Sequence, residues 1–275
     1  MLKTLWEKCR IVGSILLNLF VVRWEPVAIR MTWEAVGPQT FTFYTENSNV
    51  FAFFVCLLVA VCQVVRLFRG GPLPRWVKGL KFVAACCLTM TFLTVVFVLG
   101  PYYADQGGAV FLLTESSMLY HHLLNPLCVF CSFVLLEREP KLPASCIPLA
   151  LVPTVLYGSI ALWANVKRLW VGPYPFLMVY EQTVEQTVLW CAAILAANLF
   201  YAWLLWLLGG NRSRRRVGLL FRQKSHDRKQ KSICSFWLQM LFASIAIFKN
   251  SADQNGIFAI CRLRMLLVHS KRKRL

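Results

Sequence analysis

Residues 50–67 read VFAFFVCLLVAVCQVVRL, an apolar run interrupted only by Gln63 and Arg66. Lipid offers no hydrogen-bond partner to the backbone, and this run lacks the alternation of a barrel strand, so we expect a helix. Its length is close to the ~20 residues that cross a ~30 Å hydrocarbon core. Four more runs of the same character follow it, at 82–99, 118–136, 147–166 and 188–208. The sequence therefore predicts an integral membrane protein.

A shorter apolar run, Ile11 to Val22, is interpreted as an uncleaved first span. Basic residues precede it, as in a secretory signal, but no small-residue cleavage site follows before Arg23 and Trp24. Arg10, Arg23 and Trp24 can anchor the two ends of this span at the membrane interfaces. The expected fold class is all-α, a polytopic bundle of six transmembrane helices at 1–210 with a basic tail at 211–275.

The distribution of charge predicts the orientation of this bundle. Sixteen of the 30 Lys and Arg residues follow Gly210, so the formal charge of +18 belongs mainly to the tail. The loop 66–81 carries five basic residues and no acid, whereas 101–117 carries Asp105 and Glu115 and no base. By the positive-inside rule, the first loop is cytoplasmic and the second lies outside. Both termini are then cytoplasmic, and the expected location is the cell membrane, as a multi-pass protein.

The tail contains one apolar segment, at 233–248, that could cross the membrane or lie on it. Crossing would place the closing basic cluster at 271–274 outside, against the charge rule, so an interfacial helix or loosely ordered tail is favoured. Anionic inner-leaflet lipids are its expected partner. Two alternative interpretations of the tail are that it binds nucleic acid or that it is a dispensable extension. Of the two possible partners, lipid is expected and nucleic acid is not.

A first polar cluster, FTFYTENSN at 41–49, stands at the predicted outer entrance of the second span. If the helix begins near Thr45, then Thr45, Ser48 and Asn49 share one face, and a polar stripe enters the membrane there. The alternative is that Thr45 is only a helix N-cap, whose hydroxyl accepts a hydrogen bond from the amide of Ser48.

A second cluster, YHHLLNP at 120–126, lies near the outer end of the fourth span. His121 and His122 precede Asn125 by four and three residues, so its amide can bond at least one imidazole and fix the tautomer. Ionisable groups inside a span are functional candidates. Adjacent histidines point in different directions, however, and one of them is expected to be only interfacial. Two histidines are too few ligands for a metal site, and neither a metal nor another cofactor is expected.

A third cluster, WVGPYPFL at 170–177, precedes the last span. Its prolines and aromatic rings suit the membrane interface, where Trp and Tyr partition. One interpretation is that this segment only anchors the chain at the membrane interface. The predicted topology nevertheless puts it on the same side as the other two clusters, where Tyr174, Pro175 and Phe176 could roof a shared pocket.

These three clusters, in this order, resemble a largely uncharacterised bacterial family of six-span integral membrane proteins. More distantly they resemble the eukaryotic androgen-induced membrane proteins, which are intramembrane threonine hydrolases of fatty-acid esters of hydroxy fatty acids. The resemblance covers about residues 1–210 and implies a catalytic Thr at the start of the second span and a His in the fourth. Thr45 and His122 are the preferred matches, and Thr42 and His121 are the alternates. Ser48, Asn49 and Asn125 would support them.

A Thr and His pair suffices for acyl transfer, because a neutral imidazole can take the hydroxyl proton and then return it to the leaving alcohol. The predicted function is therefore hydrolysis of a lipid ester at the outer membrane face, with membrane lipids as partners. The alternative is a non-catalytic membrane scaffold or binding protein. A transporter is less favoured, because transporters usually carry an ionisable residue near mid-membrane, and the predicted spans offer none.

Overall fold

The computed structural model describes residues 2–210, with side chains from Leu5 onward. The predicted tail at 211–275, including the segment 233–248, lies outside the described residues. Within 2–210, six helical stretches are long and apolar enough to cross a membrane, which confirms the predicted all-α fold class. Their main helices are α1 (Leu2–Val36), α2 (Tyr44–Arg69), α3 (Arg75–Thr94), α7 (Asn125–Cys131), α8 (Leu151–Val166) and α9 (Val184–Leu208).

Shorter turns extend or connect these helices. The third span continues from α3 through a π-helical turn, Val95–Leu99, into α4 (Gly100–Tyr102). The fourth begins at α6 (Ser116–Met118), passes through a π-helical turn, Leu119–Leu124, into α7, and ends in another, Ser132–Leu136. The remaining pieces are α5 (Gly108–Thr114) and the 3₁₀ turns Gly37–Thr42, Ala104–Gln106, Ala144–Cys146, Pro148–Ala150 and Pro175–Leu177.

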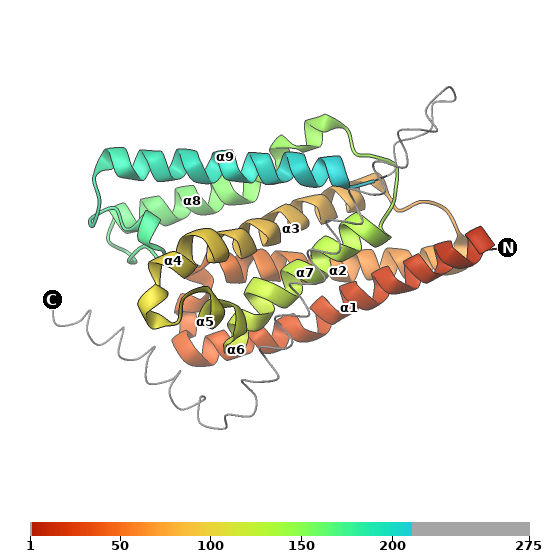
Figure 1. Cartoon of the computed structure of the whole chain (residues 1–275), viewed down its shortest axis with the longest axis horizontal. Coiled ribbons are helices and arrows are strands. Elements are labelled where there is room, and N and C mark those ends of the chain that lie inside the picture. The colour runs from red at the N-terminus through yellow and green to blue at the C-terminus, as the bar shows by residue number, and fades with distance from the viewer. Residues whose placement is uncertain (1, 211–275) are drawn as a thin grey trace.

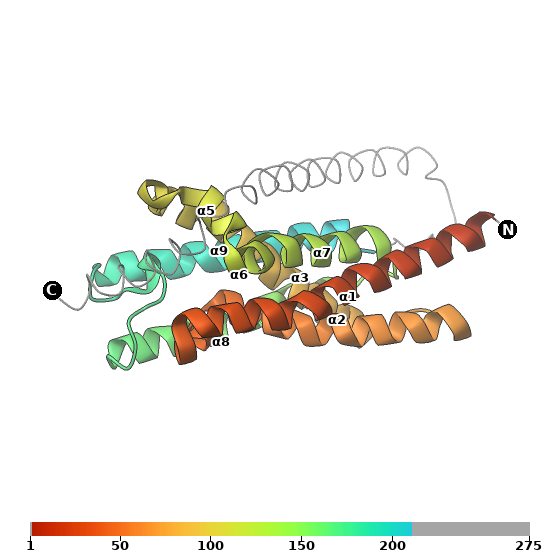
Figure 2. The same ribbon diagram turned by 90° about the horizontal axis from the view of Figure 1, so that it is seen from below.

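The six spans lie side by side, as Figures 1 and 2 show. Helix α1 packs on α2 and α7, while α3 packs on α2, α7 and α9, so α3 and α7 form the centre of the bundle. Helices α8 and α9 lie together along one side. The start of α1 and the end of α9 lie at the same end of the bundle (Figure 1), as an even number of crossings requires. We call this the Arg66 end and the opposite one the Thr45 end.

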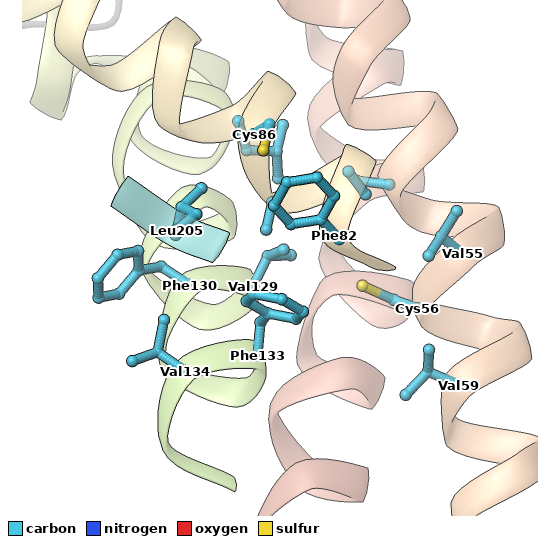
Figure 3. Close-up of a cluster of buried hydrophobic side chains, with 14 of the residues drawn as sticks. Val55, Cys56, Val59, Phe82, Cys86, Val129, Phe130, Phe133, Val134 and Leu205 are labelled. Atoms are coloured by element: carbon cyan, nitrogen blue, oxygen red, sulfur yellow. The ribbon is translucent and has the colours of Figure 1, made fainter. Parts of the chain in front are cut away.

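The core of the bundle is apolar and closely packed. Phe82 of α3 and Phe133 of the fourth span meet with their ring centroids 6.0 Å apart. Cys56 of α2 and Val129 of α7 pack around them, as Figure 3 shows, and α9 contributes Leu205. Both rings are almost fully buried, so this cluster fixes the spacing of α2, α3, α7 and α9.

The first span is longer than predicted, because α1 continues past Val22 as one helix to Val36. Pro26 lies inside it, although its ring nitrogen cannot donate to a carbonyl one turn earlier. The predicted end of the first span at Val22 is therefore wrong, and residues 23–36, expected to lie in a loop outside the membrane, are helical. The reason is tertiary: Glu25 and Thr32, which look like loop residues in the sequence, are buried against the fourth span.

A buried polar cluster joins three segments, α1, α3 and the end of the fourth span, toward the Arg66 end. Lys81 donates a 2.6 Å hydrogen bond to Oδ1 of Asn18 and lies 3.9 Å from the Glu137 carboxylate, which also accepts bonds from Ser14 and Asn18. Lys81 and Glu137 are both fully buried. Lys81 and Glu137 lie just outside the predicted spans 82–99 and 118–136, so they add buried charge at the ends of the spans and not near mid-membrane. Both residues sit at the edges of apolar runs, where the sequence reads as loop.

Candidate functional site

Helix α2 begins at Tyr44, so Thr45 lies in its first turn. The residue before the helix is Phe43, which makes no side-chain cap, and the N-cap interpretation of Thr45 is therefore wrong. Ser48 Oγ and Asn49 Nδ2 each donate to the Thr45 carbonyl, at 2.9 Å. These bonds place the three residues on one face of the helix, as their spacing predicts, and all three are buried.

The Thr45 hydroxyl contacts a phenol from the segment before α9. Tyr174 OH lies 3.3 Å from Thr45 Oγ1 and accepts a hydrogen bond of the same length from the Thr45 amide. Burial raises the pKa of Tyr174, and the nearby Glu46 carboxylate raises it further. The phenol therefore stays protonated. Because its oxygen already accepts from the amide, its O–H is left to donate.

A glycine holds the segment that carries Tyr174 in place. A Cβ at Gly172 would lie 2.5 Å from the carbonyl oxygen of Leu177, which no side chain tolerates. The backbone at Gly172 therefore packs directly against the end of the 3₁₀ turn Pro175–Leu177. Phe176 in that turn stacks on Tyr174, with ring centroids 5.2 Å apart.

A cavity of about 250 Å³ opens beside Thr45, between α2, α3, α8, α9 and the 3₁₀ turn Pro175–Leu177. Its walls are mostly apolar, with Leu99, Leu162 and Ile194 among them. The polar groups on its wall include two hydrogen-bonded pairs, Thr45 with Tyr174 and Tyr44 with Thr154. The arrangement suits a ligand with a long apolar part and a small polar group.

Thr42, the alternate threonine, lies outside this arrangement. Its hydroxyl donates to the Gln39 carbonyl at 2.7 Å, within the 3₁₀ turn Gly37–Thr42. Its own carbonyl accepts a bond from the Tyr157 hydroxyl. Thr42 is not part of the cavity wall. Of the two threonines, only Thr45 presents its side chain to the cavity.

Both histidines are buried, so the expectation that one is interfacial is wrong. They lie in the π-helical turn Leu119–Leu124, and such turns are frequent at functional sites. His122 Nδ1 lies 2.6 Å from the Leu112 carbonyl oxygen. Since a carbonyl only accepts, Nδ1 carries the proton, and Nε2 of the neutral ring is left with its lone pair.

His121 instead lies between two carboxylates. Its Nε2 is 3.3 Å from Glu25 Oε2, and its Nδ1 is 3.7 Å from Glu46 Oε1. With an acceptor facing each ring nitrogen, the doubly protonated imidazolium is the form that suits this position. An imidazolium cannot take a proton from a hydroxyl. The geometry therefore favours His122 over His121 as a base.

Asn125 connects the histidine turn to the first two helices. Its Nδ2 donates to Glu25 Oε2 at 2.9 Å and to Asn49 Oδ1 at 3.1 Å, while Asn49 Nδ2 donates to the His121 carbonyl at 3.1 Å. The expected bond from Asn125 to an imidazole is not among the contacts of the described chain. The amide bridges α1, α2 and α7 instead.

The structure thus brings Thr45, Tyr174, Ser48, Asn49 and Asn125 into one region at the Thr45 end. Within residues 2–210, no hydrogen bond joins the Thr45 hydroxyl to either imidazole, so the Thr and His pair stays a prediction. Sequence reasoning missed Glu25 and Glu46 as site residues. The signal for Glu25 is its place in a repeat of three or four residues along α1, whose members are the buried Ile11, Ser14, Asn18, Val21, Glu25, Ala28 and Thr32.

In the part of the chain that the structure describes, no three His, Cys, Asp or Glu side chains are arranged to hold a metal ion. Comparisons with family models, with curated proteins and with solved structures give no match to this chain. The chemistry of the site therefore rests on its own residues.

Proposed function

We propose that this integral membrane protein is a lipid-ester hydrolase that uses Thr45 as nucleophile and His122 as base. The observation that carries the proposal is the placement of a buried threonine hydroxyl on the wall of a mostly apolar cavity, beside a phenol that can donate. The cavity would hold an acyl chain and bring its ester to Thr45. The resemblance of the three polar clusters to the threonine hydrolases supports the same assignment.

In the proposed reaction, His122 Nε2 takes the Thr45 proton as Oγ1 bonds to the ester carbonyl carbon. As negative charge develops on the carbonyl oxygen, this oxygen accepts a hydrogen bond from the Tyr174 O–H. The imidazolium then protonates the departing alcohol as its C–O bond breaks, which leaves an acyl group on Thr45. A water molecule then attacks this acyl group with the imidazole again as base. The bond between the acyl carbon and Oγ1 breaks, the imidazolium returns its proton to Oγ1, and the acid is released.

The competent state requires Nε2 of His122 within about 3 Å of Thr45 Oγ1, or one water away. In the described structure, Thr45 Oγ1 contacts Tyr174 instead. Binding of an ester in the cavity would have to draw this hydroxyl toward the imidazole. Catalytic contacts are often long in unliganded enzymes and tighten only with substrate.

The test is turnover of a fluorogenic long-chain ester by the purified protein in lipid nanodiscs. We expect Thr45→Ala to lose turnover, Thr45→Ser to keep part of it, and His122→Gln to lower it by about 100-fold or more. Thr42→Ala is the matched control, because it removes the same hydroxyl from a residue outside the cavity. Equal turnover in Thr45→Ala and the parent protein would overturn the proposal.

A non-catalytic lipid-binding protein is the second candidate, because the present partner of the Thr45 hydroxyl is a phenol and not a base. A binding assay with a fluorescent fatty acid separates the two functions. A Cβ at Gly158, on the cavity wall, has no atom within 4 Å, so Gly158→Leu should fill the space and weaken binding under either proposal. Retained binding without any ester turnover would favour the second candidate.

A further inference from the structure

The cluster of Glu25, His121 and Glu46 is the most concentrated set of buried ionisable groups at the Thr45 end. Glu25 and His121 are 2% and 1% exposed, and Glu46 is 8% exposed. They come from α1, the π-helical turn and α2, so three separate segments bring them together. Ester hydrolysis by Thr45 and His122 gives Glu25 no role.

The charges of the cluster do not balance when both carboxyls are ionised. An imidazolium between two carboxylates leaves a net charge of −1, and a neutral imidazole leaves −2. Among the described residues, the ion-pair contacts of this cluster are internal to it: His121 Nε2 to Glu25 Oε2 at 3.3 Å and His121 Nδ1 to Glu46 Oε1 at 3.7 Å. Uncompensated charge in the interior of a membrane protein is costly. One further proton on a carboxyl makes the cluster neutral.

The surrounding elements provide neutral partners. Asn125 of α7 donates to Glu25, and Asn49 of α2 donates to the His121 carbonyl. His122 follows in the same turn with its Nδ1 bonded to the Leu112 carbonyl. Two neutral phenols, Tyr174 of the loop and Tyr157 of α8, are near enough to Glu46 to feel its charge. The additional proton therefore has to reside within the cluster.

The carboxyl groups also offer a place for this proton. Glu25 Oε2 accepts from Asn125 and Glu46 Oε1 faces His121, but Glu25 Oε1 and Glu46 Oε2 are buried without a hydrogen-bond partner. Buried polar atoms in native proteins are rarely left unpaired. His121 Nε2 is also without a hydrogen bond, and no hydrogen bond joins the two carboxyls in the described chain. Each carboxyl therefore has one buried oxygen with no partner, which can carry the additional proton.

We propose that Glu25, His121 and Glu46 form an exchangeable-proton site, in which the pair of carboxyls holds one proton in total while His121 is an imidazolium. The proton enters and leaves through Glu46, which is the most exposed of the three and lies beside Thr45. Release of the proton leaves a carboxylate, and uptake restores the neutral carboxyl, with no other bond made or broken. The site does not depend on the proposed ester hydrolysis.

Infrared spectroscopy of the purified full chain in nanodiscs tests this site without any substrate. A protonated carboxyl has a C=O stretch that is separate from the bands of a carboxylate and shifts in D₂O. We expect this band in the parent protein at neutral pH. We also expect the band to be lost in Glu25→Gln and in Glu46→Gln alike. In either variant the charge of the imidazolium equals that of the one remaining carboxylate, so the cluster is neutral without an additional proton. Glu34→Gln, at a well-exposed position paired with Arg30, is the matched control and should keep the band.

His121→Gln provides the opposite change. Without the imidazolium, both carboxyls must be protonated to avoid a buried charge, so the band should roughly double. In the parent protein the band should disappear as the pH is raised and return when it is lowered. Absence of the band at neutral pH, or its persistence in both glutamine variants, would overturn the proposal. A band that does not respond to pH would contradict the proposal that the proton of this site is exchangeable.

Circular dichroism identifies any variant that has not folded. Glu46→Gln changes the least buried of the three residues, so this variant keeps the test decisive if the other two fail to fold.

Discussion

The ammonium of Lys81 donates a 2.6 Å hydrogen bond to Oδ1 of Asn18, and this contact ties α3 to α1 inside the bundle. Both side chains are fully buried. The Glu137 carboxylate, 3.9 Å from the ammonium, completes the charge balance. Removing the cation alone would leave that carboxylate uncompensated.

We therefore expect Lys81→Met to lower the free energy of unfolding by about 3–5 kcal/mol, because it breaks a buried pair from one side. The double variant with Glu137→Gln should recover part of this loss. Reversible unfolding in mixed detergent measures both. Lys167→Ala, at an exposed position, should change stability by less than about 0.5 kcal/mol. A Lys81→Met protein as stable as the parent would show that Lys81 and Glu137 do not pair in the membrane.

Gly172 should be intolerant of a side chain. A Cβ there meets the Leu177 backbone at 2.5 Å, so Gly172→Ala has to displace the segment that carries Tyr174. We expect weaker fatty-acid binding in the cavity and a lower melting temperature. Gly79→Ala in α3 is the control, since its Cβ meets nothing within 4 Å and Ala is the better helix residue by about 1 kcal/mol. Unchanged fatty-acid binding in Gly172→Ala would show that the position of the segment with Tyr174 does not affect the cavity.

Alkaline pH should destabilise the protein partly through Tyr174. Burial raises its pKa in the folded state above the value of about 10 of an unfolded chain. The unfolded state then loses its proton first, so stability is complete below pH of about 10 and falls as the pH rises through the folded pKa. Unfolding measured at a series of alkaline pH values should show a smaller decline in Tyr174→Phe. An identical slope in both proteins would contradict a buried phenol.

Orientation can be measured by labelling with an impermeant maleimide. Gln106 is exposed at the Thr45 end and Arg69 is exposed at the other, so a cysteine at either position avoids packed residues. In a background in which Cys9, Cys146, Cys234 and Cys261 are replaced by serine, we expect Gln106→Cys to react from outside the cell and Arg69→Cys only after the membrane is opened. The reverse result would invert the predicted topology and place the Thr45 cavity on the cytoplasmic side.

Part of the site could be predicted because its residues are neighbours in the chain. Thr45, Ser48 and Asn49 share a helix face by their spacing alone, and the structure confirms that face. Tyr174 could be placed at the correct end of the bundle from the number of spans, but its contact with Thr45 depends on how the loop folds over α2. The partners of His121 were not predictable, since Glu25 lies 96 residues earlier on a helix that seemed to end before it.

The sequence by itself determined that residues 2–210 form six helices long and apolar enough to cross a membrane, because a backbone in lipid has to satisfy its own hydrogen bonds and an apolar run of sufficient length can do so only as a helix. It also determined which short motifs lie at the Thr45 end. Only the tertiary structure decided which polar groups are buried. Lys81, Glu25 and Glu137 look like loop residues by local polarity, and they enter the bundle because each finds its partner on another helix. Local sequence does not encode that pairing, since the cost of burying a charge is met by residues far away in the chain.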